Sequence, residues 1–281
     1  MTVCVVCENK IRFIKKYKAL KECQECHHIF ADIELDFNEI KKIYSNNYFF
    51  GEEYISYIDD EKQIKKNSNK RLKVINNYIK KFKKLNLYEI GCAYGFFLNT
   101  VKNNFHIVEG IDVNKEAINY AKNNLKLNVK YENFLEVNIP QNKFNIFCMF
   151  DVIEHLLNPQ KYIRKIYKIA DSNSLLFLTT GDIGSLNAKF KGENWRLIHP
   201  PSHIHYFSKK TIKKILENNG FEILSIEYCG YYRNLSFILN KIEFLKNNFK
   251  FLLKFLNYFK VLKLDIYLNI FDIMFVIAKK K

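Results

Sequence analysis

Apolar residues fall in short runs along the chain from residue 85 onward, and segments with helical periodicity separate these runs. The runs have the length of buried strands, and the segments between them repeat apolar residues every three or four positions. Such alternation predicts a parallel sheet covered by helices. The expected strands are residues 87–91, 107–111, 129–133, 144–150, 175–180, 221–228 and 270–278, and the expected helices are residues 96–104, 115–124, 162–170 and 209–219.

Two further segments have helical periodicity. Residues 61–84 are basic and place Leu72, Ile75 and Ile79 at helical spacing, after a tyrosine-rich stretch. Residues 233–264 combine Leu, Phe and Ile with intervening lysines in the same rhythm. A basic amphipathic helix of this kind packs on its own domain or lies on a membrane surface, and the sequence leaves both readings open.

Composition limits the fold and the location. The chain has 281 residues, of which 48% are hydrophobic, and this is enough for a sizeable core. No apolar run approaches the roughly 20 residues that span a bilayer. Met1 is not followed by the basic and apolar regions of a secretory signal. We therefore expect a cytoplasmic protein.

The net charge of +16 favours anionic partners such as nucleic acid, anionic lipid or phosphorylated substrates. The lysines are nevertheless scattered and form no dense tract. The chain is also rich in Asn, Ile, Phe and Tyr, which are read, like Lys, from AT-rich codons. Codon bias therefore explains the charge as well as a functional role does.

Four of the seven cysteines form two matched pairs. Two residues separate Cys4 from Cys7 and Cys23 from Cys26, and the segment between the pairs alternates like a short β-hairpin. Two such turns present four thiolates to one point, which predicts a structural zinc ion in tetrahedral coordination. The segment Cys23 to His27 also fits a c-type haem attachment, and one pair alone fits a redox dithiol, but neither reading explains both pairs.

A glycine-containing turn follows the first expected strand of the sheet. Residues 89–98 read Glu-Ile-Gly-Cys-Ala-Tyr-Gly-Phe-Phe-Leu, with small side chains at Gly91, Ala93 and Gly95. Small residues let the backbone approach a ligand closely, and the helix that follows offers unpaired amides. A dinucleotide turn needs a further glycine where this chain has Phe96, so the turn does not favour a pyrophosphate.

Asp112 stands at the end of the second expected strand, 21 residues after Gly91. A carboxylate at this position accepts hydrogen bonds from both ribose hydroxyls of a bound nucleoside. The alternative is a purely structural role, in which Asp112 caps the helix that begins near Lys115. The turn and the carboxylate together favour a cofactor that carries a nucleoside.

These residues resemble the first motif of class I S-adenosylmethionine-dependent methyltransferases, an acidic residue followed by glycines, here Glu89, Gly91 and Gly95. Ala93 replaces the middle glycine that the family usually has. The resemblance implies that Glu89 holds the cofactor's amino group and that Asp112 holds its ribose. Asn133 stands where the family has an aspartate near the adenine. The implied cofactor-binding residues are Glu89, Gly91, Cys92, Ala93, Gly95, Asp112, Val113, Asn133, Phe134 and Asp151.

Two later stretches resemble the subgroup of ubiquinone-type and sugar methyltransferases. Residues 150–156 look like its fourth-strand motif, and residues 195–208 look like the loop after its fifth strand. A zinc-binding front end is seen in methyltransferases of sugar and surface-polysaccharide pathways. The implied fold is α/β: a Rossmann-like, doubly wound, mostly parallel sheet with strand order 3-2-1-4-5-7-6, whose seventh strand is antiparallel.

The pattern and the resemblance together divide the chain into three parts. We expect residues 1–40 to form the zinc-ribbon-like segment and residues 41–84 to form a helical and tyrosine-rich linker that covers the cofactor site. Residues 85–281 are expected to form the domain that binds S-adenosylmethionine.

The acceptor site is expected over the cofactor, in the loop from residue 181 to residue 208, because this loop leaves the carboxyl edge of the sheet. His203 is the first candidate for the general base and His155 the second, because imidazole suits proton transfer near neutral pH. A buried structural histidine is the competing reading of His203. The expected acceptor-binding residues are Trp195, Arg196, His199, His205 and Tyr206, with Arg196 facing a phosphate.

The resulting hypothesis is methyl transfer from S-adenosylmethionine to a small molecule, most simply a sugar or polysaccharide precursor that bears a phosphate. The alternatives are an RNA methyltransferase that holds RNA with its zinc segment and lysines, or a cofactor-binding domain without activity. The Asn/Asp-Pro-Pro-Tyr signature of base-amine methylation is absent, and no arginine-rich stripe interleaved with aromatics is present. Nucleic acid is therefore not the expected partner.

Overall fold

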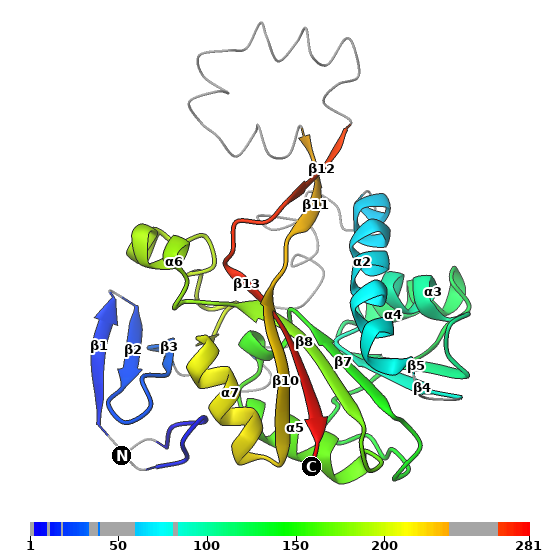
Figure 1. Ribbon diagram of the computed structural model, residues 1–281, viewed down its shortest axis with the longest axis horizontal. Coiled ribbons are helices and arrows are strands. Elements are labelled where there is room, and N and C mark those ends of the chain that lie inside the picture. Colours follow the sequence, from blue (N-terminus) through cyan, green and yellow to red (C-terminus); the bar gives the residue numbers. More distant parts are fainter. Residues whose placement is uncertain are drawn as a thin grey trace, which may run out of the picture.

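A mixed sheet forms the centre of the protein (Figure 1). The structure is a computed structural model that describes residues 3–9, 12–17, 19–33, 39, 60–80, 84–235 and 264–281. The strands of this sheet run in the order β10-β13-β8-β7-β4-β5-β6. They are β4 (Asn86–Ile90), β5 (Ile107–Asp112), β6 (Asn128–Tyr131), β7 (Ile146–Phe150), β8 (Leu175–Gly181), β10 (Phe221–Tyr228) and β13 (Ile273–Lys280).

The pairing of these strands confirms the predicted fold class and strand order. Neighbouring strands from β6 to β8 pair in parallel, whereas β13 pairs antiparallel with both β8 and β10. Every residue of β7 is buried, as expected of a central strand that helices cover on both faces. The last strand lies at Ile273–Lys280, slightly later than the predicted 270–278.

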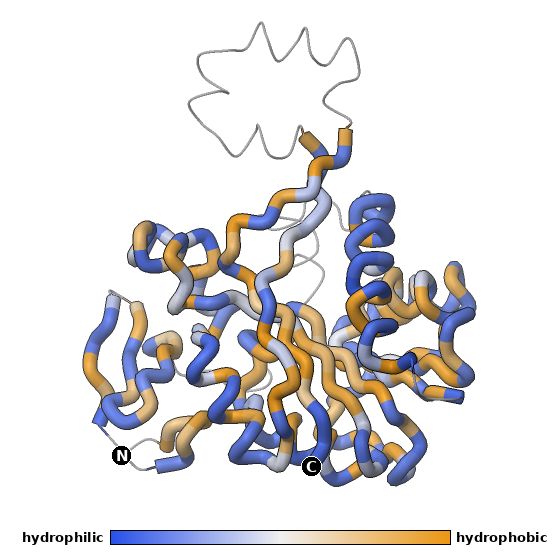
Figure 2. Tube along the Cα trace, in the orientation of Figure 1, coloured by the Kyte–Doolittle hydropathy of each residue, from blue (hydrophilic) through white to orange (hydrophobic). Residues whose placement is uncertain are grey.

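Helices cover both faces of the sheet (Figure 1). One face packs on α2 (Glu61–Ile79), α3 (Phe96–Val101) and α4 (Lys115–Asn123), and the other packs on α5 (Pro159–Ile169) and α7 (Lys209–Asn218). Figure 2 shows the hydrophobic central strands beside the largely hydrophilic α2. The amphipathic helices thus bury one apolar stripe each and leave the rest to solvent.

The cysteine-bearing segment forms a second, smaller sheet. The predicted hairpin is present as β1 (Phe13–Tyr17) and β2 (Leu20–Cys23), followed by β3 (Ile29–Ala31). The fourth strand is β9 (His205–Tyr206), which comes from the loop after β8 and pairs antiparallel with β3. This long-range pairing was not predicted, because a strand of two residues leaves no periodic pattern in the sequence.

A ribbon of two strands interrupts the connection between β10 and β13. β11 (Tyr231–Asn234) pairs antiparallel with β12 (Asp265–Leu268) and projects from the sheet (Figure 1). The prediction of a helix over 233–264 is therefore wrong at its start, because Arg233 and Asn234 lie in a strand. Residues 236–263 and the tyrosine-rich stretch 44–57 lie outside the described residues.

Short helices complete the connections at the upper edge of the sheet. A 3-10 turn, Ile153–His155, follows β7, and α6 (Leu186–Lys191) and a second 3-10 turn, Gly192–Asn194, follow β8. Within the residues that the structure describes, no helix is both long enough and apolar enough to cross a membrane.

Candidate active site

The glycine turn after β4 is built as the sequence predicted. Gly91 and Gly95 both have a φ of +75°, in the left-handed region that favours glycine. A Cβ on Gly91 would lie 2.4 Å from Cγ2 of Val152, which follows β7. Gly91 and Cys92 both donate backbone hydrogen bonds to the carbonyl of Ile111 in β5. The turn is thus held tightly between the ends of β5 and β7.

Asp112 holds the same turn from the end of β5. One carboxylate oxygen accepts the backbone N–H of Ala93 at 2.8 Å, and the other accepts that of Asn114 at 2.8 Å. Burial raises the pKa of Asp112, and these backbone donors oppose the rise. The cap of α4 is Asn114, whose side chain accepts the N–H of Ala117. Asp112 is therefore not the helix cap, and its half-buried carboxylate lies beside the turn.

Glu89 is a buried carboxyl beside the glycine turn. Only 4% of its surface is exposed, and its Oε2 atom is buried without a hydrogen-bond partner. Burial raises the pKa of Glu89 to about 8, and Asp112 adds to the rise while Arg71 opposes it. A buried carboxyl with an unused oxygen suits a ligand cation, and the ammonium group of S-adenosylmethionine is such a cation. The residues present therefore fit the implied cofactor.

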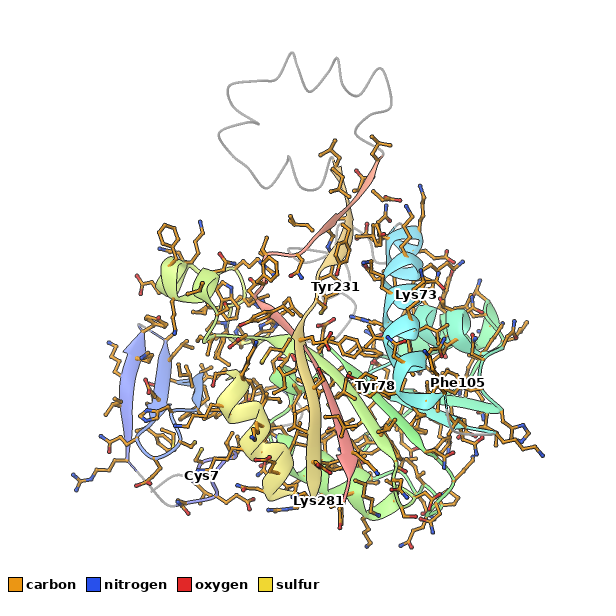
Figure 3. The ribbon with its side chains drawn as sticks, viewed as in Figure 1. Cys7, Lys73, Tyr78, Phe105, Tyr231 and Lys281 are labelled. Atoms are coloured by element: carbon orange, nitrogen blue, oxygen red, sulfur yellow. The ribbon has the colours of Figure 1, made fainter. Side chains whose placement is uncertain are left out.

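Arg71 of α2 is a site residue that the sequence reasoning missed. Its guanidinium donates to Asp151 Oδ2 at 2.8 Å and lies 4.3 Å from the ring centre of Phe150. Thr179 and Tyr231 also donate to the Asp151 carboxylate, each at 2.8 Å. Three elements distant in sequence thus converge on one aspartate at the end of β7, and Figure 3 shows Tyr231 at the base of the ribbon beside α2.

The two residues expected to contact the adenine, Asn133 and Phe134, are already in contact with other protein groups. Asn133 Oδ1 accepts hydrogen bonds from the N–H of Leu135 and the hydroxyl of Tyr162. Phe134 is 2% exposed, and its ring stacks on Tyr162 with centroids 5.6 Å apart. Phe134 therefore presents little surface to a ligand in this conformation. Cys92 is buried, which raises its thiol pKa well above the ordinary value, and Val113 is half-buried beside Asp112.

The loop after β8 encloses a small pocket. Its lining combines aromatic rings, imidazoles and one carboxyl, from Glu154, Thr180, Gly181, Trp195, Leu197, His203, His205 and Tyr206. Thr180 at the end of β8 lines the pocket, whereas the preceding residue, Thr179, has its side chain on the opposite face of the sheet and donates to Asp151. The predicted residues Trp195, His203, His205 and Tyr206 are thus brought together.

Three imidazole rings gather at this pocket, of which His203 lines it. The ring centroid of His203 lies 3.8 Å from that of His199 and 4.6 Å from that of His155. His203 Nδ1 lies 2.9 Å from the carbonyl of Leu197, so Nδ1 carries the proton and Nε2 carries the lone pair. Burial, and then the neighbouring His155 and His199, lower the pKa of His203 well below its ordinary value. His203 is therefore a neutral imidazole at neutral pH.

Trp195 and Arg196 are both held by Asp272, which is 1% exposed and comes just before β13. Trp195 Nε1 donates to Asp272 Oδ2 and Arg196 Nη2 donates to Asp272 Oδ1, each at 2.9 Å. Asn187 of α6 donates to the same carboxylate at 2.9 Å. The Arg196 guanidinium, expected to face a phosphate, is thus already engaged by Asp272.

The paired cysteines converge as zinc ligands would. The sulfur–sulfur distances are 3.6 Å for Cys4 and Cys26, 3.8 Å for Cys7 and Cys23, and 3.3 Å for Cys23 and Cys26. All four sulfur atoms lie within 4.8 Å of one another. Sulfur atoms about 2.3 Å from one central zinc ion would be spaced about 3.8 Å apart in a tetrahedron. The four thiols therefore fit a closed, structural zinc site.

Comparison with known proteins agrees with this geometry. The family described as "Methyltransferase domain" matches residues 61–226. The ubiquinone biosynthesis O-methyltransferase of Coxiella burnetii is 24% identical over 178 residues, which cover 58% of this chain and 74% of that protein. The mitochondrial ubiquinone biosynthesis O-methyltransferase of Dictyostelium discoideum is 28% identical over 132 residues, 39% of this chain and 41% of that protein.

Solved structures share the fold at low sequence identity. Magnesium protoporphyrin IX methyltransferase from Synechocystis PCC 6803, solved with bound SAH, has a TM-score of 0.57 at 11% identity and covers 88% of this chain and 100% of that chain. A SAM-dependent methyltransferase from Archaeoglobus fulgidus has a TM-score of 0.54 at 21% identity and covers 80% and 99%, respectively. With the family match over residues 61–226, the chain belongs to the class I methyltransferases that use S-adenosylmethionine.

Proposed function

We propose that this enzyme methylates a small molecule, a sugar or polysaccharide precursor, of which the reacting hydroxyl alone enters the small pocket of the loop after β8. The observation that carries the proposal is the position of this pocket at the carboxyl end of β8, the strand that pairs with β7, whose end carries Asp151. A nucleophile in the pocket would approach the methyl group from the carboxyl edge of the sheet, where ligands of doubly wound sheets bind.

The residues around the glycine turn match the charges of the cofactor. The Glu89 carboxyl, whose Oε2 has no partner, would face the cofactor's ammonium group, and the Arg71 guanidinium, which donates to Asp151, would attract its carboxylate. Asp112, which already accepts the backbone N–H of Ala93, would accept the ribose hydroxyls as well. When bound, S-adenosylmethionine supplies an activated methyl group, so the protein has to orient the acceptor and exclude water.

The pocket wall suits a hydroxyl-bearing acceptor. Trp195, Tyr206 and His203 line the pocket, and the proposed role of the His203 imidazole is to take the proton released from the hydroxyl as the new O–C bond forms. The names of the matched relatives support oxygen as the methylated atom, because they are O-methyltransferases.

Labelled methyl donor and a panel of acceptors test this proposal. The panel contains nucleotide sugars, polysaccharide precursors, phenolic ring compounds and RNA. We expect label to enter a sugar-bearing acceptor and to be absent from RNA. Asp112→Ala serves as the control, because loss of the charged contact lowers cofactor affinity about tenfold to a hundredfold.

Each other outcome has a definite meaning. Label in RNA supports the nucleic-acid alternative, and label only in phenolic compounds replaces the sugar with an aromatic acceptor. Cofactor binding without label in any member of the panel supports a binding domain without activity. Wild-type affinity in Asp112→Ala would show that Asp112 does not hold the ribose.

A further inference from the structure

The cysteine-bearing segment (the cysteine module, residues 3–9, 12–17 and 19–33) is joined edge to edge with the loop that forms the pocket. Within the small sheet, Ile29 pairs with Tyr206 and Phe30 pairs with His205. The backbone N–H of Ala31 donates to the carbonyl of Ile204 at 2.8 Å. The module also contacts α7, where Asn218 donates to the carbonyl of Val6. The module is thus docked at two places on the methyltransferase domain.

A buried pair of histidines reinforces this junction. His28 is 1% exposed, and its Nε2 lies 3.0 Å from Nδ1 of His205. The His28 ring also lies against Phe207, with centroids 5.0 Å apart. A hydrogen bond between two buried rings has a fixed geometry, so His28 sets the orientation of the His205 ring.

The residues that β3 holds are wall residues of the pocket. His205 and Tyr206 both line it, and the Tyr206 hydroxyl donates to the backbone carbonyl of His203 at 3.0 Å. The remaining wall comes from the end of β8, the 3-10 turn after β7 and the loop around Trp195. One side of the pocket therefore depends on a strand that the cysteine module supports.

The turn that carries Cys23 and Cys26, two of the expected metal ligands, connects directly to His28. The backbone N–H of Cys23 donates to the carbonyl of His28 at 2.9 Å, and the N–H of Cys26 donates to the Cys23 sulfur at 3.3 Å. An ion bound by these thiols would fix the turn, and the turn would fix the start of β3. Structural zinc sites contribute folding free energy to small modules of this size.

We infer that the cysteine module supports one wall of the acceptor pocket through the pairing of β3 with β9, and that His28 is a positioning residue that acts on the pocket through His205. The inference rests on the proposed function in taking this pocket as the acceptor site. The coupling itself, from the metal-binding turn through β3 to β9, is a property of the fold that can be measured without an acceptor.

Hydrogen exchange and NMR on the full-length, zinc-loaded protein test the coupling. In His28→Ala we expect amide exchange across residues 203–207 to rise about tenfold, because one buried hydrogen bond is lost. The ring nitrogen signals of His205 should also shift, and His28→Gln, which keeps a hydrogen-bonding group, should restore them. The matched control is His27→Ala, because His27 belongs to the same turn but is exposed and contacts Glu22.

Affinity for S-adenosylhomocysteine, measured by calorimetry on the same samples, separates a failure of the coupling from a failure of the proposed function. We expect it to stay within about twofold of the wild type in His28→Ala. Removal of the metal from the wild-type protein by a chelator should reproduce the faster exchange at residues 203–207, which keeps the test valid if His28→Ala does not fold. Exchange that rises only within residues 19–31 would overturn the inference. Absence of S-adenosylhomocysteine binding by the wild type would instead contradict the proposed function.

Discussion

At the scale of single residues, titratable groups near the glycine turn are buried where few polar groups surround them. Glu89 is the clearest case, because burial raises its pKa to about 8. The unfolded chain loses this proton near pH 4.3. Between these values the folded protein binds a proton that the unfolded chain does not, so Glu89 lowers the stability as pH rises through this window.

Binding of the cofactor should therefore release a proton from Glu89. A ligand ammonium favours the ionised carboxylate and lowers the pKa that burial had raised. We expect affinity for S-adenosylhomocysteine to increase as pH rises from about 6 to about 8, and calorimetry in two buffers of different ionisation enthalpy to report the released proton. Glu89→Gln should weaken binding and flatten its pH dependence. Glu109→Gln is the control, because Glu109 pairs with Lys143 on the surface of the sheet. Binding that is independent of pH in the wild type would refute this role.

His203 gives a prediction on turnover. Its low pKa keeps the imidazole neutral, so the base form persists well below neutral pH. His203→Ala should lower turnover about 10²–10⁴-fold with little change in cofactor affinity. The comparison variant is His199→Ala, because the His199 ring lies against that of His203 while its Nδ1 lies within hydrogen-bond distance of the Ser202 hydroxyl. Near-normal turnover of His203→Ala would identify His203 as a packing residue and direct the search to His155.

Residue roles differ in how well the sequence reveals them. Gly91 and Asp112 are recognisable because the turn and the strand end lie at a fixed spacing within one β-α-β unit. Arg71 and Asp272 leave no such signal, since each acts through a partner on another element: Asp151 for Arg71, Trp195 for Asp272. In the sequence, a single arginine on a basic helix cannot be distinguished from a solvent-exposed side chain. Only the fold shows which partner it contacts.

At the scale of elements, periodicity predicted the strands and helices of the central sheet, because each buries one continuous apolar face. It failed for β9, whose two residues join another sheet, and for β11 within the expected amphipathic helix. The division into residues 1–40, 41–84 and 85–281 remains a prediction. The pairing of β3 with β9 indicates that the first part packs directly on the third.

The cysteine module should carry one zinc ion per chain. Metal analysis of protein purified without added zinc is expected to give one equivalent, and Cys23→Ser should lose it, because three thiolates bind the ion less tightly than four. Cys229→Ser is the matched control, since Cys229 lies far from the cluster in sequence and is half-buried beside β10. Full zinc content in Cys23→Ser would exclude Cys23 as a ligand.

At the scale of the whole molecule, the strand order and the antiparallel β13 follow from the family fold, whereas the charge of +16 does not identify a partner. Part of the excess charge is engaged locally, since Lys62 and Lys66 of α2 both contact Asp265 of the ribbon. The remaining lysines are scattered along the sequence, which favours a diffuse positive field over one dense basic tract.

Such a field predicts weak nucleic-acid binding that depends steeply on salt. We expect a single-stranded oligonucleotide to bind at low ionic strength and to be released by about 200 mM salt, because counterion release supplies nearly all of the affinity. Fluorescence anisotropy over a salt series measures this. Nanomolar affinity that is retained at physiological salt would instead support RNA as the acceptor.

The path of the chain between β10 and β13 has a consequence for how this enzyme can diversify. The backbone N–H of Cys229 donates to the carbonyl of Ile273, so the chain leaves and re-enters the sheet at adjacent positions. The chain between Cys229 and Ile273 connects the two strands of one hairpin. For a flexible connection, halving the length changes the free energy of loop closure by only about 0.6 kcal/mol. The same excursion supplies Tyr231 to Asp151 and Asp272 to Trp195. Insertions and deletions between β11 and β12 are therefore expected to change the stability of the sheet little and to leave these two contacts in place.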